Sequence, residues 1–78
     1  MLWLEIAERQ YLDLPDDARE LVDARLMQLT HAPSRVPDAV YDPTYAQWSV
    51  TLGGRGFMMY ALVTEPATVI VLLLVLLV

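Results

Sequence analysis

The C-terminal end of the chain is the feature that most constrains its fold. Ten consecutive apolar residues occupy positions 69–78, directly after Thr68. A transmembrane helix needs about 20 apolar residues, and Glu65 and Pro66 interrupt any extension of the run back towards Phe57. The segment as a whole is rich in Val and Ile, and a Glu beside a Pro in its middle is typical of two strands joined by a turn. The pattern therefore disfavours a membrane tail.

The same apolar run predicts that the domain needs a partner. It lacks the alternation of a strand with one face in water, so both faces of a strand here are expected to be covered. A single layer of helices covers one side of a sheet only. We therefore expect another surface to cover the second side. A partner protein and a homodimer both remain open at this point.

Composition places the chain among small folded domains. With 78 residues it forms a single domain over residues 1–78, and 56% hydrophobic residues exclude disorder. No cysteine is present, which excludes a disulfide scaffold and a zinc–cysteine site. Ten acidic residues against five arginines, a net charge of −5, argue against coating of DNA or RNA. The N-terminus has no basic region, so we expect a cytoplasmic protein rather than a secreted one.

Hydrophobic periodicity predicts a strand and then helices in the first half of the chain. Residues 2–7 alternate loosely, as in a strand, and residues 7–14 predict a short helix that ends at Pro15. The clearest helix follows Pro15 and runs to about His31, with Asp17 and Glu20 at the spacing of a capping box.

The second half predicts a loop and a three-stranded antiparallel meander. Residues 33–46 contain three prolines and predict a loop, and strands are expected over residues 47–52, 57–63 and 68–78. Glycines 53, 54 and 56 supply the backbone freedom that the first hairpin turn requires. We expect an α+β fold with one or two helices packed on a mostly antiparallel four-stranded sheet.

Several of these segments resemble a known family. They are Leu12-Asp-Leu-Pro15, Leu26-Met-Gln-Leu29, Gln47-Trp-Ser-Val-Thr-Leu52, the glycine-rich turn, Met58-Met-Tyr60 and the final Val/Ile-rich strand. From about residue 7 onward the chain resembles the RelE/ParE superfamily of bacterial toxins from type II toxin–antitoxin modules. The resemblance implies a small cytoplasmic stress-response protein, with two helices on an antiparallel sheet, that a partner antitoxin holds inactive.

The resemblance implies two kinds of activity. RelE-like members cleave mRNA on the ribosome, and ParE-like members inhibit DNA gyrase. In the ribonuclease branch an arginine usually lies three residues before the tyrosine that matches Tyr60, and Phe57 occupies this position here. Residues 1–78 do not include the basic stretch that follows the last strand in that branch. Two interpretations follow: a toxin that is a candidate endoribonuclease, and a non-catalytic protein-interaction domain derived from the same superfamily.

Five residues are candidates for a functional role. If the chain is a ribonuclease, Arg55 is the candidate stabiliser of phosphate charge, with Tyr60 or His31 assisting. Each has a structural alternative. Arg55 is then a solubilising charge on a hairpin, Tyr60 is an aromatic side chain packed within the sheet, and His31 is a cation at a helix C-terminus. Tyr41 and Tyr45 are candidate contacts for the antitoxin, because tyrosine is frequent in interfaces.

The sequence predicts neither a metal site nor a cofactor. The lone His31 has no cluster of ligands at metal-binding spacing around it. The glycines at 53, 54 and 56 join two predicted strands, whereas a phosphate-binding loop opens a helix.

Overall fold

Two helices and a five-stranded sheet form the fold in the computed structural model, which describes residues 1–33, 35–64 and 67–77. The elements in chain order are β1 (Leu2–Trp3), α1 (Glu5–Leu12), α2 (Asp16–His31), β2 (Val40–Asp42), β3 (Gln47–Thr51), β4 (Gly56–Thr64) and β5 (Ala67–Leu76). The strand order is β1-β5-β4-β3-β2, in which β1 is parallel to β5 and the other neighbours are antiparallel. The predicted α+β class is confirmed.

The prediction of a four-stranded sheet was wrong, because β2 lies within the expected loop. Val40 pairs with Ser49 and Asp42 pairs with Gln47, and the Tyr41 and Trp48 rings lie 4.9 Å apart. The prolines at positions 37 and 43 limit this strand to three residues, since proline cannot donate to a sheet. A strand of three residues is too short to show a clear alternation of apolar and polar residues in the sequence.

The N-terminal strand is also shorter than predicted. After β1, the Leu4 amide donates to the Val71 carbonyl oxygen at 3.0 Å, and α1 begins at Glu5. The carboxylates of Glu5 and Glu8 lie in the first helical turn, where they stabilise the positive end of the helix dipole. A helix therefore replaces the second half of the expected strand.

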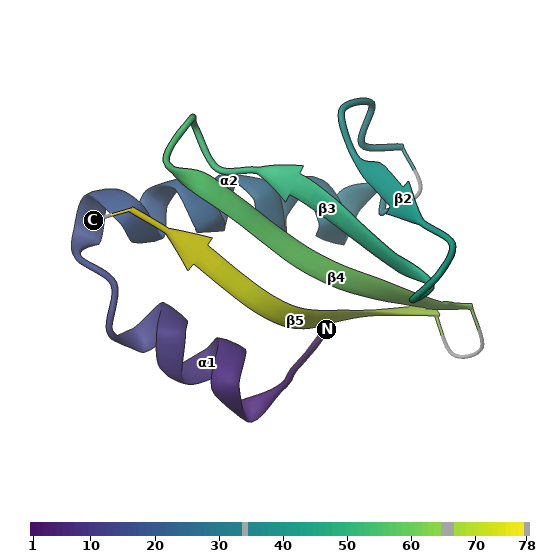
Figure 1. The fold of residues 1–78 in the computed structure, drawn as a ribbon, viewed down its shortest axis with the longest axis horizontal. Coiled ribbons are helices and arrows are strands. Elements are labelled where there is room, and N and C mark those ends of the chain that lie inside the picture. Colours follow the sequence, from purple (N-terminus) through teal and green to yellow (C-terminus); the bar gives the residue numbers. More distant parts are fainter. Residues whose placement is uncertain (34, 65–66, 78) are drawn as a thin grey trace.

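The α1 helix lies along the β5 edge of the sheet (Figure 1). Its Gln10 Oε1 accepts a hydrogen bond from the Leu74 amide at 3.0 Å. This bond satisfies a backbone donor of β5 beyond the short stretch that pairs with β1. The Tyr11 hydroxyl donates to Asp23 Oδ1 on α2 at 2.7 Å, so the two helices are tied together. These contacts protect an edge that would otherwise be open to pairing with another chain.

The α2 helix lies behind the sheet in Figure 1 and covers one of its faces. It has the predicted bounds of residues 16–31, but within the described residues no side-chain hydrogen bond caps it, and the expected capping box does not form. The Asp17 carboxylate instead pairs with Arg55. The core lies between this helix and the sheet. Its fully buried members include Val22, Leu29, Val50, Leu52, Met58, Tyr60 and Val71.

Candidate functional site

The sheet face opposite α2 is the candidate functional surface of the fold. Side chains alternate along β4, so that Met58 and Tyr60 are buried under α2 whereas Phe57 and Met59 point to the other side. Figure 1 shows this side of the sheet uncovered by either helix. We call it the open face. Its apolar members along the two long strands are Phe57, Met59, Ala61, Val63, Ile70, Leu73 and Val75.

The open face is apolar and nearly free of charge. In the pairing register, Met59 lies between Ser49 and Leu73, so its neighbours carry a hydroxyl and an aliphatic side chain. Phe57 and Val75 are 39% and 40% exposed, high values for apolar residues in the middle of a sheet. Apolar patches of this kind mark surfaces that bind another apolar surface.

A shallow depression of about 390 Å³ lies on this face between β2, β3 and β4. Val40, Ser49, Phe57 and Met59 are among the residues that line it, together with Asp42. The Asp42 carboxylate already accepts a hydrogen bond from the Thr44 amide at 2.9 Å, which holds it in a local turn. The depression therefore offers shape for an apolar side chain but no pair of groups for acid–base chemistry.

Arg55 lies at the rim of the open face, on the β3–β4 hairpin. Its Nη1 donates to Asp17 Oδ2 at 2.8 Å and its Nε donates to the Leu77 carbonyl oxygen at 3.3 Å. The hydrogen bond from Arg55 lowers the pKa of the Asp17 carboxyl, so the pair is charged at neutral pH. An arginine that is paired with a carboxylate of the same chain is a poor ligand for phosphate unless that ion pair opens.

Tyr60 is buried on the side of the sheet that α2 covers. This position agrees with the predicted alternation, which put it on the face opposite Phe57 and Met59. Its side chain has no solvent exposure, and its hydroxyl has no hydrogen-bond partner among the described residues. Burial raises the pKa of the Tyr60 hydroxyl, which makes proton release still less favourable.

The three catalytic candidates do not meet in the structure. His31 ends α2, with its Nδ1 2.9 Å from the Met27 carbonyl oxygen, whereas Arg55 contacts Asp17 in the first turn of the same helix. A helix of 16 residues is about 24 Å long at a rise of about 1.5 Å per residue. His31 and Arg55 are therefore too far apart to act on one phosphodiester, and Tyr60 lies in the core beneath the sheet.

The two tyrosines predicted to contact an antitoxin lie at the β2 edge. Tyr41 is on β2 and packs against Trp48, and it remains 46% exposed. Tyr45 lies in the turn between β2 and β3 and is 69% exposed. Both side chains are accessible, and their role in binding a partner stays a prediction.

The sequence analysis missed a cluster of hydrogen bonds around Arg25. Its guanidinium donates to the Thr51 carbonyl oxygen at 2.9 Å and to Gln28 Oε1 at 2.9 Å, and it forms a two-point ion pair with Asp38. Hydrogen bonding from Arg25 lowers the pKa of the Asp38 carboxyl. The cluster joins α2, the following loop and β3. No local pattern signals a contact between residues 26 positions apart in the sequence.

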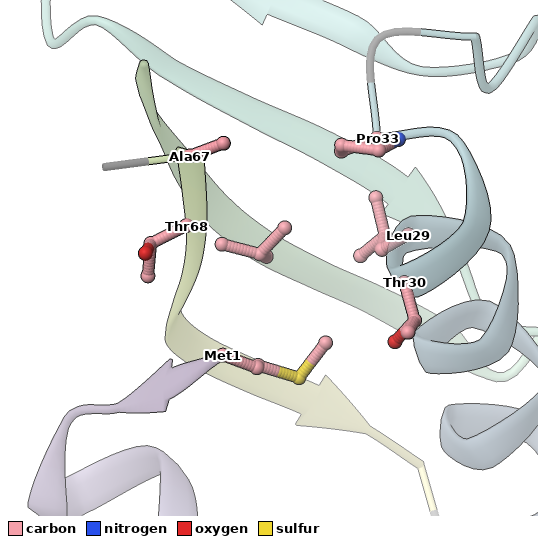
Figure 2. A pocket seen from close by; sticks show the side chains of 7 residues that line it. Met1, Leu29, Thr30, Pro33, Ala67 and Thr68 are labelled. Atoms are coloured by element: carbon pink, nitrogen blue, oxygen red, sulfur yellow. The ribbon is translucent and has the colours of Figure 1, made fainter. Parts of the chain in front are cut away.

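Figure 2 shows a second hollow, of about 250 Å³, between the end of α2 and the start of β5. Leu29 and Pro33 line one side of it and Ala67 the other, while the Met1 side chain closes the third side. Thr30 and Thr68 are also part of its lining, and the Thr68 side chain is directed away from the gap. The hollow contains no titratable side chain and so has no means for catalysis.

Other kinds of site were sought within the described ranges. Over residues 1–33, 35–64 and 67–77, no group of three or more His, Cys, Asp or Glu side chains is placed to hold a metal ion. In the same ranges, no helix has the length and apolar character needed to cross a membrane. Comparison of the chain with protein-family models, curated proteins and solved structures gives no match.

Replacement of Tyr60 by phenylalanine is expected to leave the fold equally stable or to stabilise it by about 1 kcal/mol. The change removes a buried hydroxyl that is desolvated without a compensating hydrogen bond. The matched control is Tyr11→Phe, which removes a hydroxyl bonded to Asp23 and should cost about 1 kcal/mol. Urea unfolding of both variants measures the difference. A larger loss for Tyr60→Phe than for Tyr11→Phe would contradict the expectation.

Proposed function

We propose that this chain is a cytoplasmic, RelE/ParE-like member of a toxin–antitoxin module, and that it acts by binding a partner protein rather than by cleaving RNA. The observation that carries the proposal is the open face, which has Met59 and Leu73 at its centre and Phe57 and Val75 in the next row. A surface of this chemistry binds apolar side chains of another protein. Among the described residues, this centre carries no group suited to activating a nucleophile or protonating a leaving oxygen.

The arrangement of the layers supports a role for a partner such as an antitoxin. Both helices lie on one side or along one edge of the sheet, which leaves the opposite side available (Figure 1). In the toxin–antitoxin modules that this chain resembles, the antitoxin is a protein that covers a surface of the toxin. A segment with an apolar stripe would fit the depression lined by Val40, Phe57 and Met59.

Ribonuclease activity has less support from the geometry. Phosphodiester cleavage needs cationic groups on the phosphate and an acid or base within hydrogen-bonding reach of the reacting oxygens. Phe57 stands where the ribonuclease branch carries an arginine. Of the other candidates, Arg55 is paired with Asp17 and Tyr60 is buried. His31 lies at the far end of α2 from Arg55. A ribonuclease remains the competing outcome of the experiment below.

Induction of the chain in a bacterial culture, with total mRNA followed over time, is expected to leave mRNA intact. The Arg55→Ala variant should behave as the wild type does, because Arg55 acts in an internal ion pair. Arg35→Ala, which removes an exposed arginine in the loop after α2, is the control for loss of positive charge. Cleavage of mRNA by the wild type that disappears only in Arg55→Ala would contradict the proposal and establish a ribonuclease.

A direct test of binding uses the protein encoded by the neighbouring reading frame as the probe. Co-expression should give a stoichiometric complex that Met59→Lys abolishes, because the new charge would be buried in the interface. Met27→Lys is the matched control, since Met27 lies on α2 and is 66% exposed. Equal loss of the complex in both variants would show that binding does not use the open face.

A further inference from the structure

We infer that the open face pairs with the open face of a second copy of the chain, so that the free protein is a homodimer of two sheets stacked face to face. The inference rests on the proposed function in one respect, because both use the open face. A second copy of the chain occupies this face when no other partner protein is present. Three features of the structure lead to a second copy: the neutrality of the face, the location of the acidic residues and the size of the sheet.

The open face selects its partner by shape and apolar contact rather than by charge. Its centre consists of aliphatic, aromatic and hydroxyl side chains, and Asp42 at its margin is held by the Thr44 amide. Among the described residues, Asp42 is the acidic side chain that lines the depression on this face, so the face gives a basic partner little advantage, although the chain carries a net charge of −5. An apolar face is complementary to a copy of itself, and interfaces between identical chains are typically the most apolar.

The acidic residues of α2 lie where they do not oppose such a dimer. This helix, which lies behind the sheet, carries Asp16, Asp17, Glu20 and Asp23. Stacking two open faces puts the two α2 helices on opposite outer sides, with both sheets and about 10 Å of packed side chains between them. This separation exceeds the Debye length of about 8 Å at physiological ionic strength. Repulsion between the two acidic layers is therefore screened.

The size of the open face is sufficient for a weak, specific dimer. The central strands β4 and β5 contain 9 and 10 residues, which corresponds to strands about 30 Å long, and neighbouring strands are about 4.8 Å apart. With the shorter outer strands, one face has an area on the order of 500 Å². Two faces together bury on the order of 1,000 Å², the lower limit for a specific interface. We therefore expect a dissociation constant in the micromolar range.

The geometry of stacked sheets determines which residues meet. In a two-fold dimer, residues near the axis contact the same residues of the second copy. The centre of the face is formed by Met59 and Leu73, with Phe57 and Val75 in the next row. Methionine adapts its shape to an irregular apolar surface, which favours close contact at this centre.

Sedimentation equilibrium of the purified chain alone tests the inference. From about 5 µM to about 200 µM, a range that brackets a micromolar dissociation constant, the average mass should rise towards twice the monomer mass. Met59→Lys and Val75→Lys should each weaken the dimer by at least about tenfold, because each buries two unpaired charges across the two-fold axis. Met27→Lys should dimerise as the wild type does. Circular dichroism confirms that each variant is folded.

Three results would overturn the inference. These are a wild-type chain that stays monomeric over the whole range, a Met27→Lys variant that dimerises as weakly as Met59→Lys, and a dimer that weakens steadily as salt is raised. The last result would indicate contacts through charged groups of the helical layer. A monomeric chain that still forms a Met59-dependent complex with its neighbouring gene product overturns the homodimer only. Cleavage of mRNA overturns the proposed function and leaves the dimer measurement unaffected.

Discussion

Replacement of Gly56 by alanine is expected to remove more than half of the free energy of unfolding of the protein. Gly56 begins β4 and pairs with Leu76 at the end of β5. A Cβ atom at this position would lie 1.8 Å from the Val75 carbonyl oxygen and 2.8 Å from the Leu76 Cα, so the clash is with backbone that cannot rotate away. The two longest strands would have to separate at this end. We expect a loss of more than about 3 kcal/mol in the free energy of unfolding, against a total of only about 5 kcal/mol for a small domain.

Gly54→Ala is the matched control for this substitution. No atom lies within 4 Å of the position that its Cβ would occupy, and its φ of +77° makes the cost one of backbone conformation alone. That cost is about 1 kcal/mol. Urea unfolding followed by circular dichroism measures both variants. Similar midpoints for Gly56→Ala and Gly54→Ala would show that β5 moves aside more easily than its pairing with β4 indicates.

Truncation of Met58 to alanine is expected to cost about 2–5 kcal/mol, the range observed for large-to-small changes in a packed core. Met58 has no solvent exposure and lies in the middle of β4 between Val50 and Leu74, on the side that α2 covers. Its removal would leave a cavity at the centre of the core. Chemical denaturation at low protein concentration, where the chain is monomeric, measures the loss.

The adjacent residue supplies an internal control for the Met58 variant. Met59 has the same side chain and lies on the same strand, but it points to the open face and is only partly buried. Met59→Ala should cost less than about 1.5 kcal/mol in the monomer, because it leaves no enclosed cavity. Equal losses for the two variants would contradict the assignment of the covered and open faces.

Local patterns in the sequence predicted the elements that depend on local interactions. The α2 helix has the predicted bounds, and Gly53 and Gly54 adopt the positive φ values expected of the hairpin turn. Val50 and Leu52 are buried on one side of a strand that was expected over residues 47–52. Helix periodicity, strand alternation and glycine conformation all act within a few residues of the chain. A single sequence therefore carries these signals.

Contacts between distant residues account for what the sequence analysis missed. The Arg25 cluster joins residues 13 and 26 positions apart, and neither spacing has a local signature. β2 forms because Val40–Asp42, which lie between Pro37 and Pro43, pair with β3. The extent of α1 depends on its contacts along β5, including the hydrogen bond from the Leu74 amide to Gln10. Each feature is stabilised only once the chain has folded.

The candidate site was predictable in kind but not in location. The lack of alternation in the last strand indicated that a sheet face needs a partner, and the structure leaves one apolar face uncovered. Residues 57–63 are apolar on both sides of the strand, so periodicity alone does not say which side α2 covers. Similarly, Arg55 is a free charge in the sequence and an ion-paired one in the structure.

The sequence by itself determined the α+β class, the main helix, the hairpin turn and the need to cover a second apolar surface. The first three follow from residue types and spacings that act locally, whereas the cover for a second apolar surface stays a prediction from the total amount of apolar surface in a short chain. Only the tertiary structure decided that Met58 and Tyr60 are covered while Phe57 and Met59 stay open, and that the candidate catalytic side chains lie apart. The reason is physical: the side on which α2 packs is decided by long-range contacts, and it determines the environment of every residue on the sheet.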